Sequence, residues 1–184
     1  MVIDRPRHLF SVDDYHRMTA AGILSEHDRV ELIEGEIIEM SPIGDAHLSA
    51  VNRFNHQLSR RLAPDLLVSV QNPLRLGPHN EPQPDLAVFR PAGAGLAVPT
   101  PQNTLLVIEV ADSSLNHDRT VKAILYAQAG IPEMWLADLV NERLERHTEP
   151  SPAGYRLIAV AHRGETLPST VLPDLSFSLD DLLR

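Results

Sequence analysis

Two acidic side chains interrupt apolar, strand-like stretches in the middle of the chain. Asp85 opens the stretch DLAVFR just after a proline, and Glu109 lies within the apolar run TLLVIEVAD. The Pro/Gly/Ala-rich connector between them is long enough to return the chain antiparallel, so both carboxylates can share one sheet face. Lys122 follows in a helix predicted over residues 117–129. Two carboxylates and an ammonium placed in this way could bind a divalent metal ion and polarise a water molecule.

Lys122 is the only lysine among 16 basic residues, the other fifteen being arginines. A lysine is a compact charge with a tunable pKa, whereas an arginine is a permanently charged planar fork, so the two are not interchangeable beside a metal-bound water. Codon bias against lysine is an alternative explanation, under which Lys122 is an ordinary surface residue. Its position directly after the two acidic strands favours the functional interpretation.

Glu109 needs a compensating charge or a proton if its strand is buried. A buried carboxylate without a partner costs several kcal/mol, and two adjacent carboxylates repel each other. Mg²⁺ or Mn²⁺ bound by Asp85 and Glu109 would provide that charge and keep waters that can attack a phosphodiester. The alternative is a buried ion pair of Glu109, for instance with an arginine such as Arg75 or Arg119.

Composition limits the classes of protein to which the chain can belong. Its 184 residues, 43% of them hydrophobic, predict one compact domain over residues 1–184. The net charge of −9 argues against a broad basic surface, so any nucleic-acid contact should be local, metal-bridged or shared with a partner. The absence of cysteine excludes disulfide and thiolate chemistry. No apolar run reaches the length of a membrane span, and we expect a cytoplasmic protein.

An early hairpin carries two further acids that could face inward. The segment VELIEGEIIEM alternates apolar and acidic residues around Glu34 and Gly35, which suits a tight turn. With that turn, Glu31 pairs with Ile38 and lies on the opposite face from Glu39. Either acid could point into the protein, and a solvent-facing acidic hairpin is the alternative for each.

The clearest helix pattern begins at Asp45, which is suited to cap it, and ends before Pro64. Its apolar residues recur at spacings of three and four: Leu48, Val51, Phe54, Leu58 and Leu62. His47 lies in the first turn of this helix. A single histidine there could approach a site at the strand ends, but we interpret it as a surface residue.

The other elements predict an α/β fold with a central mixed, mostly antiparallel sheet flanked by helices. Strand patterns follow at residues 66–76 and 133–140, and a late hairpin covers residues 142–162. In that hairpin we expect four charged residues to face solvent: Glu142, Arg143, Glu145 and Arg146. Tyr126 and Trp135 are interpreted as core aromatics, and Ser178 as the cap of a short final helix.

Sequence signatures of other chemistries are missing from the chain. It has no HExxH pair for zinc, no Walker sequence for nucleotide phosphates and no GxSxG nucleophile turn. The two acidic strands and Lys122 therefore remain the strongest candidate site.

The PD element followed by an acidic strand and a helical lysine resembles the PD-(D/E)xK nuclease superfamily. The order of blocks from Val30 to Leu183 resembles the Uma-two family of putative restriction endonucleases: ELIEGEIIEMSP, a helix beginning with AH, QPDLAVFRP, LLVIEVADSS, HDRTVKAILYAQAGIPEMWLAD and LPDLSFSLDDLL. This resemblance implies a restriction-endonuclease-like core and metal-dependent cleavage of DNA.

The resemblance also implies roles for individual residues. Asp85 matches the aspartate of the PD element, Glu109 the acid of the second strand and Glu31 the acid of the early hairpin. Where a standard motif has its lysine, two residues after that acid, this chain has Ala111. Lys122 matches a lysine on the following helix and must reach the same water from there.

The leading hypothesis is therefore a Mg²⁺- or Mn²⁺-dependent endonuclease acting on DNA, with a homodimer suited to cutting both strands. Asp85 and Glu109 would ligate the metal, Glu31 would support it, and Lys122 would orient or help deprotonate the attacking water. The rival hypothesis is a catalytically inactive, nuclease-like fold that acts as a binding or regulatory module. The acidic net charge and the missing strand lysine both favour that rival.

Overall fold

A six-stranded sheet forms the centre of the molecule. The computed structural model describes residues 7–25, 27–91, 93 and 98–183. The strands lie in the order β3-β4-β5-β6-β7-β8, and every neighbouring pair is antiparallel except β5 and β6, which are parallel. Their bounds are β3 Leu67–Val70, β4 Leu86–Phe89, β5 Thr104–Ala111, β6 Glu133–Asp138, β7 Arg143–Ser151 and β8 Gly154–His162. The predicted mixed, mostly antiparallel sheet is confirmed.

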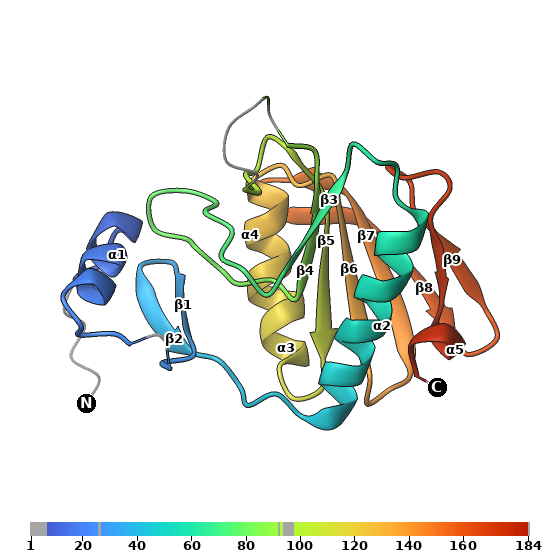
Figure 1. Ribbon diagram of the computed structural model, residues 1–184, viewed down its shortest axis with the longest axis horizontal. Coiled ribbons are helices and arrows are strands. Elements are labelled where there is room, and N and C mark those ends of the chain that lie inside the picture. Colours follow the sequence, from blue (N-terminus) through green and yellow to red (C-terminus); the bar gives the residue numbers. More distant parts are fainter. Residues whose placement is uncertain (1–6, 26, 92, 94–97, 184) are drawn as a thin grey trace.

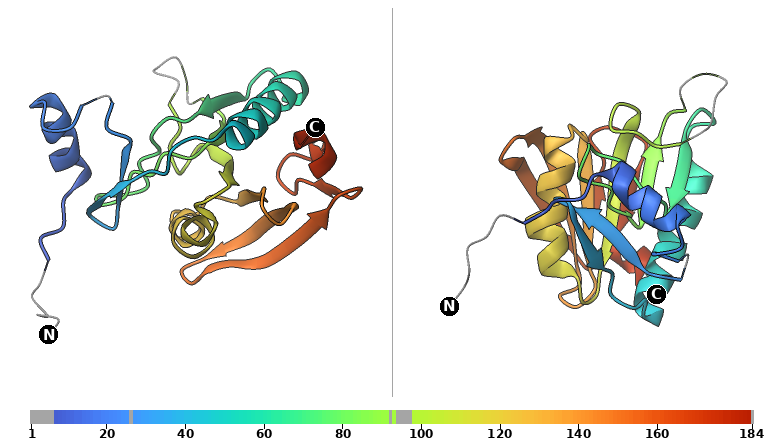
Figure 2. Two further views of the ribbon diagram at one scale, coloured as in Figure 1. Left: turned by 90° about the horizontal axis from the view of Figure 1, so that it is seen from below. Right: turned by 90° about the vertical axis from the view of Figure 1, so that its left-hand side faces the viewer.

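Helices cover both faces of this sheet (Figures 1 and 2). On one face, α2 (Asp45–Arg61) and α5 (Leu179–Leu182) pack over a core that includes Phe54, Trp135 and Phe177. On the other face, α4 (Ala123–Gln128) packs over a smaller core. Alternate residues of each central strand contribute to the two cores, as the period of two in a strand requires. A small two-stranded sheet, β9 (Thr166–Pro168) with β10 (Ser176–Ser178), precedes α5, and Ser178 caps α5 as predicted.

The helical segment after β5 connects the two parallel strands. Parallel neighbours need a crossover, and here the crossover runs through α3 (Leu115–His117), a π-helical turn (Asp118–Lys122) and α4. Gly130, at φ +78°, ends the helix in the left-handed region that favours glycine. The predicted helix over residues 117–129 is therefore present, but its first half is π-helical.

The N-terminal arm, which we define as α1 (Val12–Ala20), β1 (Val30–Ile33) and β2 (Glu36–Glu39), lies beside the main sheet (Figure 1). Its hairpin turns at Glu34 and Gly35, both at positive φ, and pairs Glu31 with Ile38 as predicted. Gly35 also has no room for a side chain, since an added Cβ would lie 2.6 Å from the Cβ of Leu9. Backbone hydrogen bonds from the arm to segment 78–81 fix it against the molecule.

Three local predictions are corrected by the structure, and a fourth lies partly outside the described residues. Residues 66–76 contain only the short strand β3, because the chain turns away at Gln71, which has φ +49°. Asp45 is the first residue of α2, and its side chain does not cap the helix. Glu145 is buried, not solvent-facing, because charged groups of three other residues surround it, and Arg143 and Arg146 are half-buried. The predicted connector after β4 lies partly outside the described residues.

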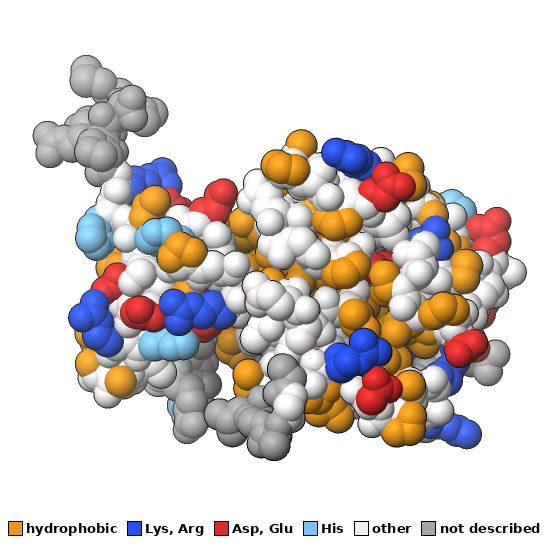
Figure 3. Space-filling view, turned by 90° about the horizontal axis from the view of Figure 1, so that it is seen from above, with side chains coloured by type: hydrophobic (Ala, Val, Ile, Leu, Met, Phe, Trp, Pro, Cys, Tyr) orange, Lys and Arg blue, Asp and Glu red, His pale blue; other side chains and the backbone are white. Residues whose placement is uncertain are grey.

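Charged side chains are dispersed over the surface seen in Figure 3, where blue and red groups alternate with apolar ones. This face carries no broad basic surface, in keeping with the net charge of −9. Within the described part of the chain, no helix is long and apolar enough to cross a membrane.

Candidate active site

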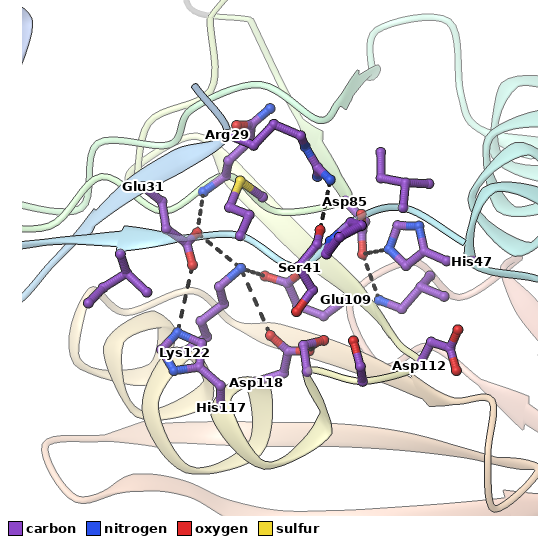
Figure 4. Close-up of a pocket in the computed structure, with 18 of the residues that line it drawn as sticks. Arg29, Glu31, Ser41, His47, Asp85, Glu109, Asp112, His117, Asp118 and Lys122 are labelled. Atoms are coloured by element: carbon purple, nitrogen blue, oxygen red, sulfur yellow. Dashed lines mark hydrogen bonds and ion pairs between the residues drawn. The ribbon is translucent and has the colours of Figure 1, made fainter. Parts of the chain in front are cut away.

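A cavity of about 370 Å³ lies where the N-terminal arm meets one end of the main sheet. The arm lines it with β1, β2 and the segment that follows, while the sheet side contributes the starts of α2 and β4, the end of β5 and the π-helical turn. All four residues singled out in the sequence line this cavity: Glu31, Asp85, Glu109 and Lys122 (Figure 4). Segments separated by up to 91 positions thus meet at one place.

Lys122 lies at the centre of the acidic groups. Its Nζ is 3.1 Å from Oε2 of Glu31, 3.5 Å from Oε1 of Glu109 and 3.9 Å from Oδ1 of Asp118. Burial opposes the charge of this side chain, but the neighbouring carboxylates outweigh burial and raise the pKa of Lys122. The side chain is therefore an ammonium, held between the arm and the sheet.

Glu31 brings the arm into the site. Only 4% of this residue is exposed, and Oε2 of its carboxylate also accepts a hydrogen bond of 3.1 Å from the backbone N–H of Gln83. Burial works to raise its pKa, but the nearby His117 ring and the Lys122 ammonium outweigh burial, so the pKa of Glu31 is lowered. The inward alternative from the sequence is correct for Glu31, whereas Glu39 is exposed.

Glu109 points to the face of β5 that α4 covers. The phenol of Tyr126 donates a hydrogen bond of 2.6 Å to its Oε1, the oxygen that also faces Lys122. Burial raises the pKa of Glu109 well above its usual range, with Lys122 acting in the opposite direction. An acid so far removed from water favours a further cation or a proton in its vicinity.

Asp85 is tied to β5 and to α2. Its Oδ2 accepts a hydrogen bond of 2.9 Å from the backbone N–H of Val110 and lies 3.0 Å from Nε2 of His47. Its Oδ1 accepts a hydrogen bond of 3.2 Å from Nε2 of Gln71. Val110 directly follows Glu109, so this bond fixes Asp85 beside the second acidic strand. The antiparallel pairing of β4 with β5, predicted from the connector, makes the contact possible.

Comparison with known proteins identifies the family. The profile of the Uma2 family, described as "Putative restriction endonuclease", matches residues 12–180. The chain belongs to the Uma2 family. The fold is similar to that of the crystal structure of "a putative nuclease belonging to DUF820" from Anabaena variabilis ATCC 29413, with a TM-score of 0.74 at 16% identity over 95% of this chain and 97% of that chain. A search of curated proteins finds no match. The nuclease-like core expected from the sequence is confirmed.

One residue of this Uma2 site, His47, was misjudged in the sequence, and a second, Tyr126, makes a contact that the sequence did not predict. His47 is not a simple surface residue, because its ring contacts Asp85 and its Nδ1 is buried, with no hydrogen-bond partner in the part of the chain that the structure describes. Tyr126 is a core aromatic, as predicted, but its hydroxyl also binds Glu109. The buried ion pair expected as an alternative for Glu109 is present, but its partner is Lys122. The two arginines named as examples bind elsewhere, Arg75 to Asp13 and Arg119 to Glu145.

Asp118 and His117 belong to the Uma2 cavity and were missed in the sequence. Asp118 accepts a hydrogen bond of 2.5 Å from Ser114, and burial raises its pKa. His117 Nε2 lies 3.7 Å from Glu31 Oε1, which is an ion-pair distance. The sequence contains a pattern that could have identified Asp118, because the polar residues at 118, 122 and 126 recur every four positions, close to the helical repeat.

The donor set of the site suits a hard divalent cation only in part. Its acids offer carboxylate oxygens, which Mg²⁺ and Mn²⁺ prefer, and restriction-endonuclease-like proteins generally use divalent metals. Among the described residues, however, no three Asp, Glu or His side chains converge as a ready-made metal site. Lys122 instead occupies the space between three of the carboxylates.

Proposed function

We propose that this Uma2 protein is a metal-dependent endonuclease that hydrolyses DNA phosphodiester bonds. The observation that supports it is the convergence of Asp85, Glu109, Glu31 and Lys122, from four separate elements, on one cavity. A second cation would offset the excess negative charge of this buried site, which contains a single ammonium. The descriptions of the family and of the structural relative also support a nuclease. DNA as the substrate is part of this proposal.

Asp85 and Glu109 would hold the metal ion. The two oxygens of Asp85 are oriented by hydrogen bonds, and Oε1 of Glu109 contacts Tyr126 and Lys122. A bound Mg²⁺ or Mn²⁺ would offset the negative charge that develops on the phosphate and supply a coordinated water.

Lys122 would orient the attacking water or the scissile phosphate. Its raised pKa keeps it an ammonium among these acids, which favours hydrogen-bond donation over removal of a proton. Glu31 would act by holding that ammonium from the arm side, at 3.1 Å. The role of Glu31 is therefore support of Lys122, which in turn faces the reacting groups.

The test is cleavage of supercoiled plasmid with Mg²⁺, with Mn²⁺ and with a chelator. We expect metal-dependent nicking by the wild type and a loss of at least about 100-fold in Lys122→Met and Glu109→Gln. Asp65→Asn, an exposed acid paired with Arg90 far from the cavity, is the matched control and should cleave like the wild type. Equal cleavage by wild type and Lys122→Met would remove Lys122 from the mechanism.

The rival is an inactive nuclease-like binding module. Besides the acidic net charge and the missing strand lysine, it is favoured by the lack of a preformed three-residue metal site among the described residues. Metal titration separates the two functions. The enzyme should melt at a higher temperature with Mn²⁺ or Mg²⁺, and Asp85→Ala should lose that gain. A wild type whose melting temperature ignores both metals would support the binding module.

Organisation and location are further proposals. We propose that residues 1–184 form a single domain and that the protein works as a cytoplasmic homodimer, because two symmetry-related sites could cut both DNA strands. Sedimentation equilibrium of the purified protein, with and without a short DNA duplex, would give the oligomeric state.

A further inference from the structure

Asp118 is a buried acid to which the proposed function assigns no role. Only 3% of the residue is exposed. Ser114 Oγ holds one of its oxygens at 2.5 Å, and the other, Oδ1, lies 3.9 Å from Lys122 Nζ. Figure 4 shows the carboxylate turned towards Lys122. An acid this far from water requires a stabilising partner, and the Lys122 ammonium provides it.

The π-helical turn explains how Asp118 and Lys122 both face the cavity. In an α-helix a residue four positions on is rotated about 40° past a full turn, so residues 118, 122 and 126 would drift around the helix. A π-helical turn holds more residues, so the same step falls short of a full turn and reverses the drift. The π-helical turn covers the first step, from 118 to 122, and α4 covers the second, from 122 to 126.

The contacts agree with this alignment. Lys122 and Tyr126 both reach Oε1 of Glu109, and Asp118 reaches Lys122. Such π-helical turns occur often at functional sites. Here the turn places an acid, an ammonium and a phenol in a row beside one strand carboxylate.

The three carboxylates around Lys122 belong to different parts of the structure and differ in their proposed roles. Glu31 belongs to the N-terminal arm, and Glu109 is the proposed metal ligand. Asp118 belongs to the helical segment that carries Lys122, so its contact persists whenever that segment is folded. It is thus suited to keep the ammonium in place while the other two carboxylates change partners.

We propose that Asp118 is a positioning residue that, through the π-helical turn, holds the Lys122 ammonium at the cavity. This inference rests on the proposed function for its catalytic consequence, but the position of the ammonium can be measured without any activity. The acid acts through Lys122 and is not itself in contact with substrate.

The single lysine makes the measurement direct. Protein labelled with [¹⁵N]lysine gives one side-chain Nζ signal, from Lys122. In the wild type, burial and three carboxylates should slow exchange of the ammonium hydrogens with water. Asp118→Asn, which keeps the size of the side chain, should shift this signal and speed its hydrogen exchange about tenfold. An unchanged signal and exchange rate in Asp118→Asn would overturn the proposal.

Two further variants keep the test decisive. Asp112→Asn makes the same chemical change at an exposed acid that lines the same cavity and points away from Lys122 in Figure 4, so its Nζ signal should match the wild type. Ser114→Ala removes only the hydrogen bond that orients Asp118, and should shift the signal in the same direction by a smaller amount. If Asp118→Asn does not fold, Ser114→Ala provides the test. An Nζ signal in Ser114→Ala that matches the wild type would then refute the role of Asp118.

Cleavage assays then distinguish failure of this inference from failure of the proposed function. If the wild type cuts DNA, Asp118→Asn should lower kcat about 10- to 100-fold with KM nearly unchanged, because a displaced ammonium affects the reaction more than binding. A wild type without nuclease activity would refute the proposed function, while the Nζ measurement would still judge Asp118. A normal kcat with a shifted Nζ signal would refute the catalytic consequence alone.

Discussion

Two buried charge clusters lie on the same face of the sheet and differ in how their charges balance. Glu109 and Glu145 both pair across the sheet with Leu136, so they lie in one row, and Lys122 and Arg119 reach them from the same π-helical turn. Around Lys122, one ammonium faces three carboxylates. Around Glu145, two acids face two arginines and a histidine, and the members are Arg119, Asp138, Arg143, Glu145 and His147.

The geometry of the contacts differs as well. Arg119 binds Glu145 with two hydrogen bonds, at 2.7 and 3.3 Å, in the fork arrangement that arginine makes with a carboxylate. The pKa of Glu145 is lowered to about 2, because His147 and Arg119 outweigh its burial, whereas the pKa of Glu109 is raised well above its usual range. The balanced cluster stabilises the fold, and the unbalanced one lines the cavity. An excess of buried negative charge is therefore a feature of the proposed active site.

Removing the central cation should have the largest effect on stability. Lys122→Met leaves three buried carboxylates without their ammonium, and we expect the metal-free protein to lose about 3–5 kcal/mol of its free energy of unfolding. Mn²⁺ should restore more stability to this variant than to the wild type, because the metal would replace the missing charge. Chemical denaturation with and without Mn²⁺ measures both effects, and a loss under about 1 kcal/mol would contradict the imbalance.

The corresponding change in the balanced cluster should be milder. Arg119→Met removes a cation from the same turn, but Arg143 and His147 continue to contact Glu145. We expect a loss of about 1–3 kcal/mol, with the Mn²⁺ response of the wild type retained. The same denaturation series provides the measurement. A Mn²⁺ response that vanished in Arg119→Met would show that the two clusters work as one.

Neutralising Glu109 should have a smaller effect on stability than either of these substitutions, and it should stabilise the protein instead of destabilising it. A carboxyl with a raised folded pKa contributes stability that is fully present below its unfolded pKa and is lost as the pH rises through the folded value. Glu109→Gln should therefore stabilise the metal-free protein by up to about 1 kcal/mol at pH 8 while abolishing the metal response. Melting curves at pH 5 and pH 8 test this, and a variant less stable than the wild type at pH 8 would refute it.

Low pH should reduce the stability that the cluster around Glu145 provides. Because the pKa of Glu145 is lowered to about 2, its contribution is present above the unfolded value near 4.5 and is lost as the pH falls towards 2. Glu145→Gln should remove that part of the acid sensitivity, on the order of 1 kcal/mol after allowance for solvent screening. Unfolding followed by circular dichroism between pH 2 and 5 would show the difference. Parallel curves for variant and wild type would contradict it.

Much of the fold could be predicted from sequence patterns. The hairpin register at Glu31, the antiparallel strands bearing Asp85 and Glu109, and the long helix from Asp45 each follow from short-range periodicity and turn residues. The uniqueness of Lys122 among the basic residues was also informative. These features depend on neighbours within a few positions, which is the range over which sequence patterns hold.

The missed features depend on distant partners. His47 carries no sequence sign that it meets Asp85, 38 positions away. Glu145 lies in a charge-rich hairpin segment that predicts a solvent-facing residue, although it is buried beside Arg119. The parallel pairing of β5 with β6 and the π-helical turn in their crossover likewise follow from packing.

By itself the sequence determined which residue types were available: hard carboxylates in apolar strands, a single lysine and no thiol. Tertiary structure alone decided that Lys122 stands among three carboxylates while Arg119 stands in a balanced pair. The reason is physical, because the free energy of a buried charge depends on all groups within a few ångströms, and residues far apart in the chain supply most of them.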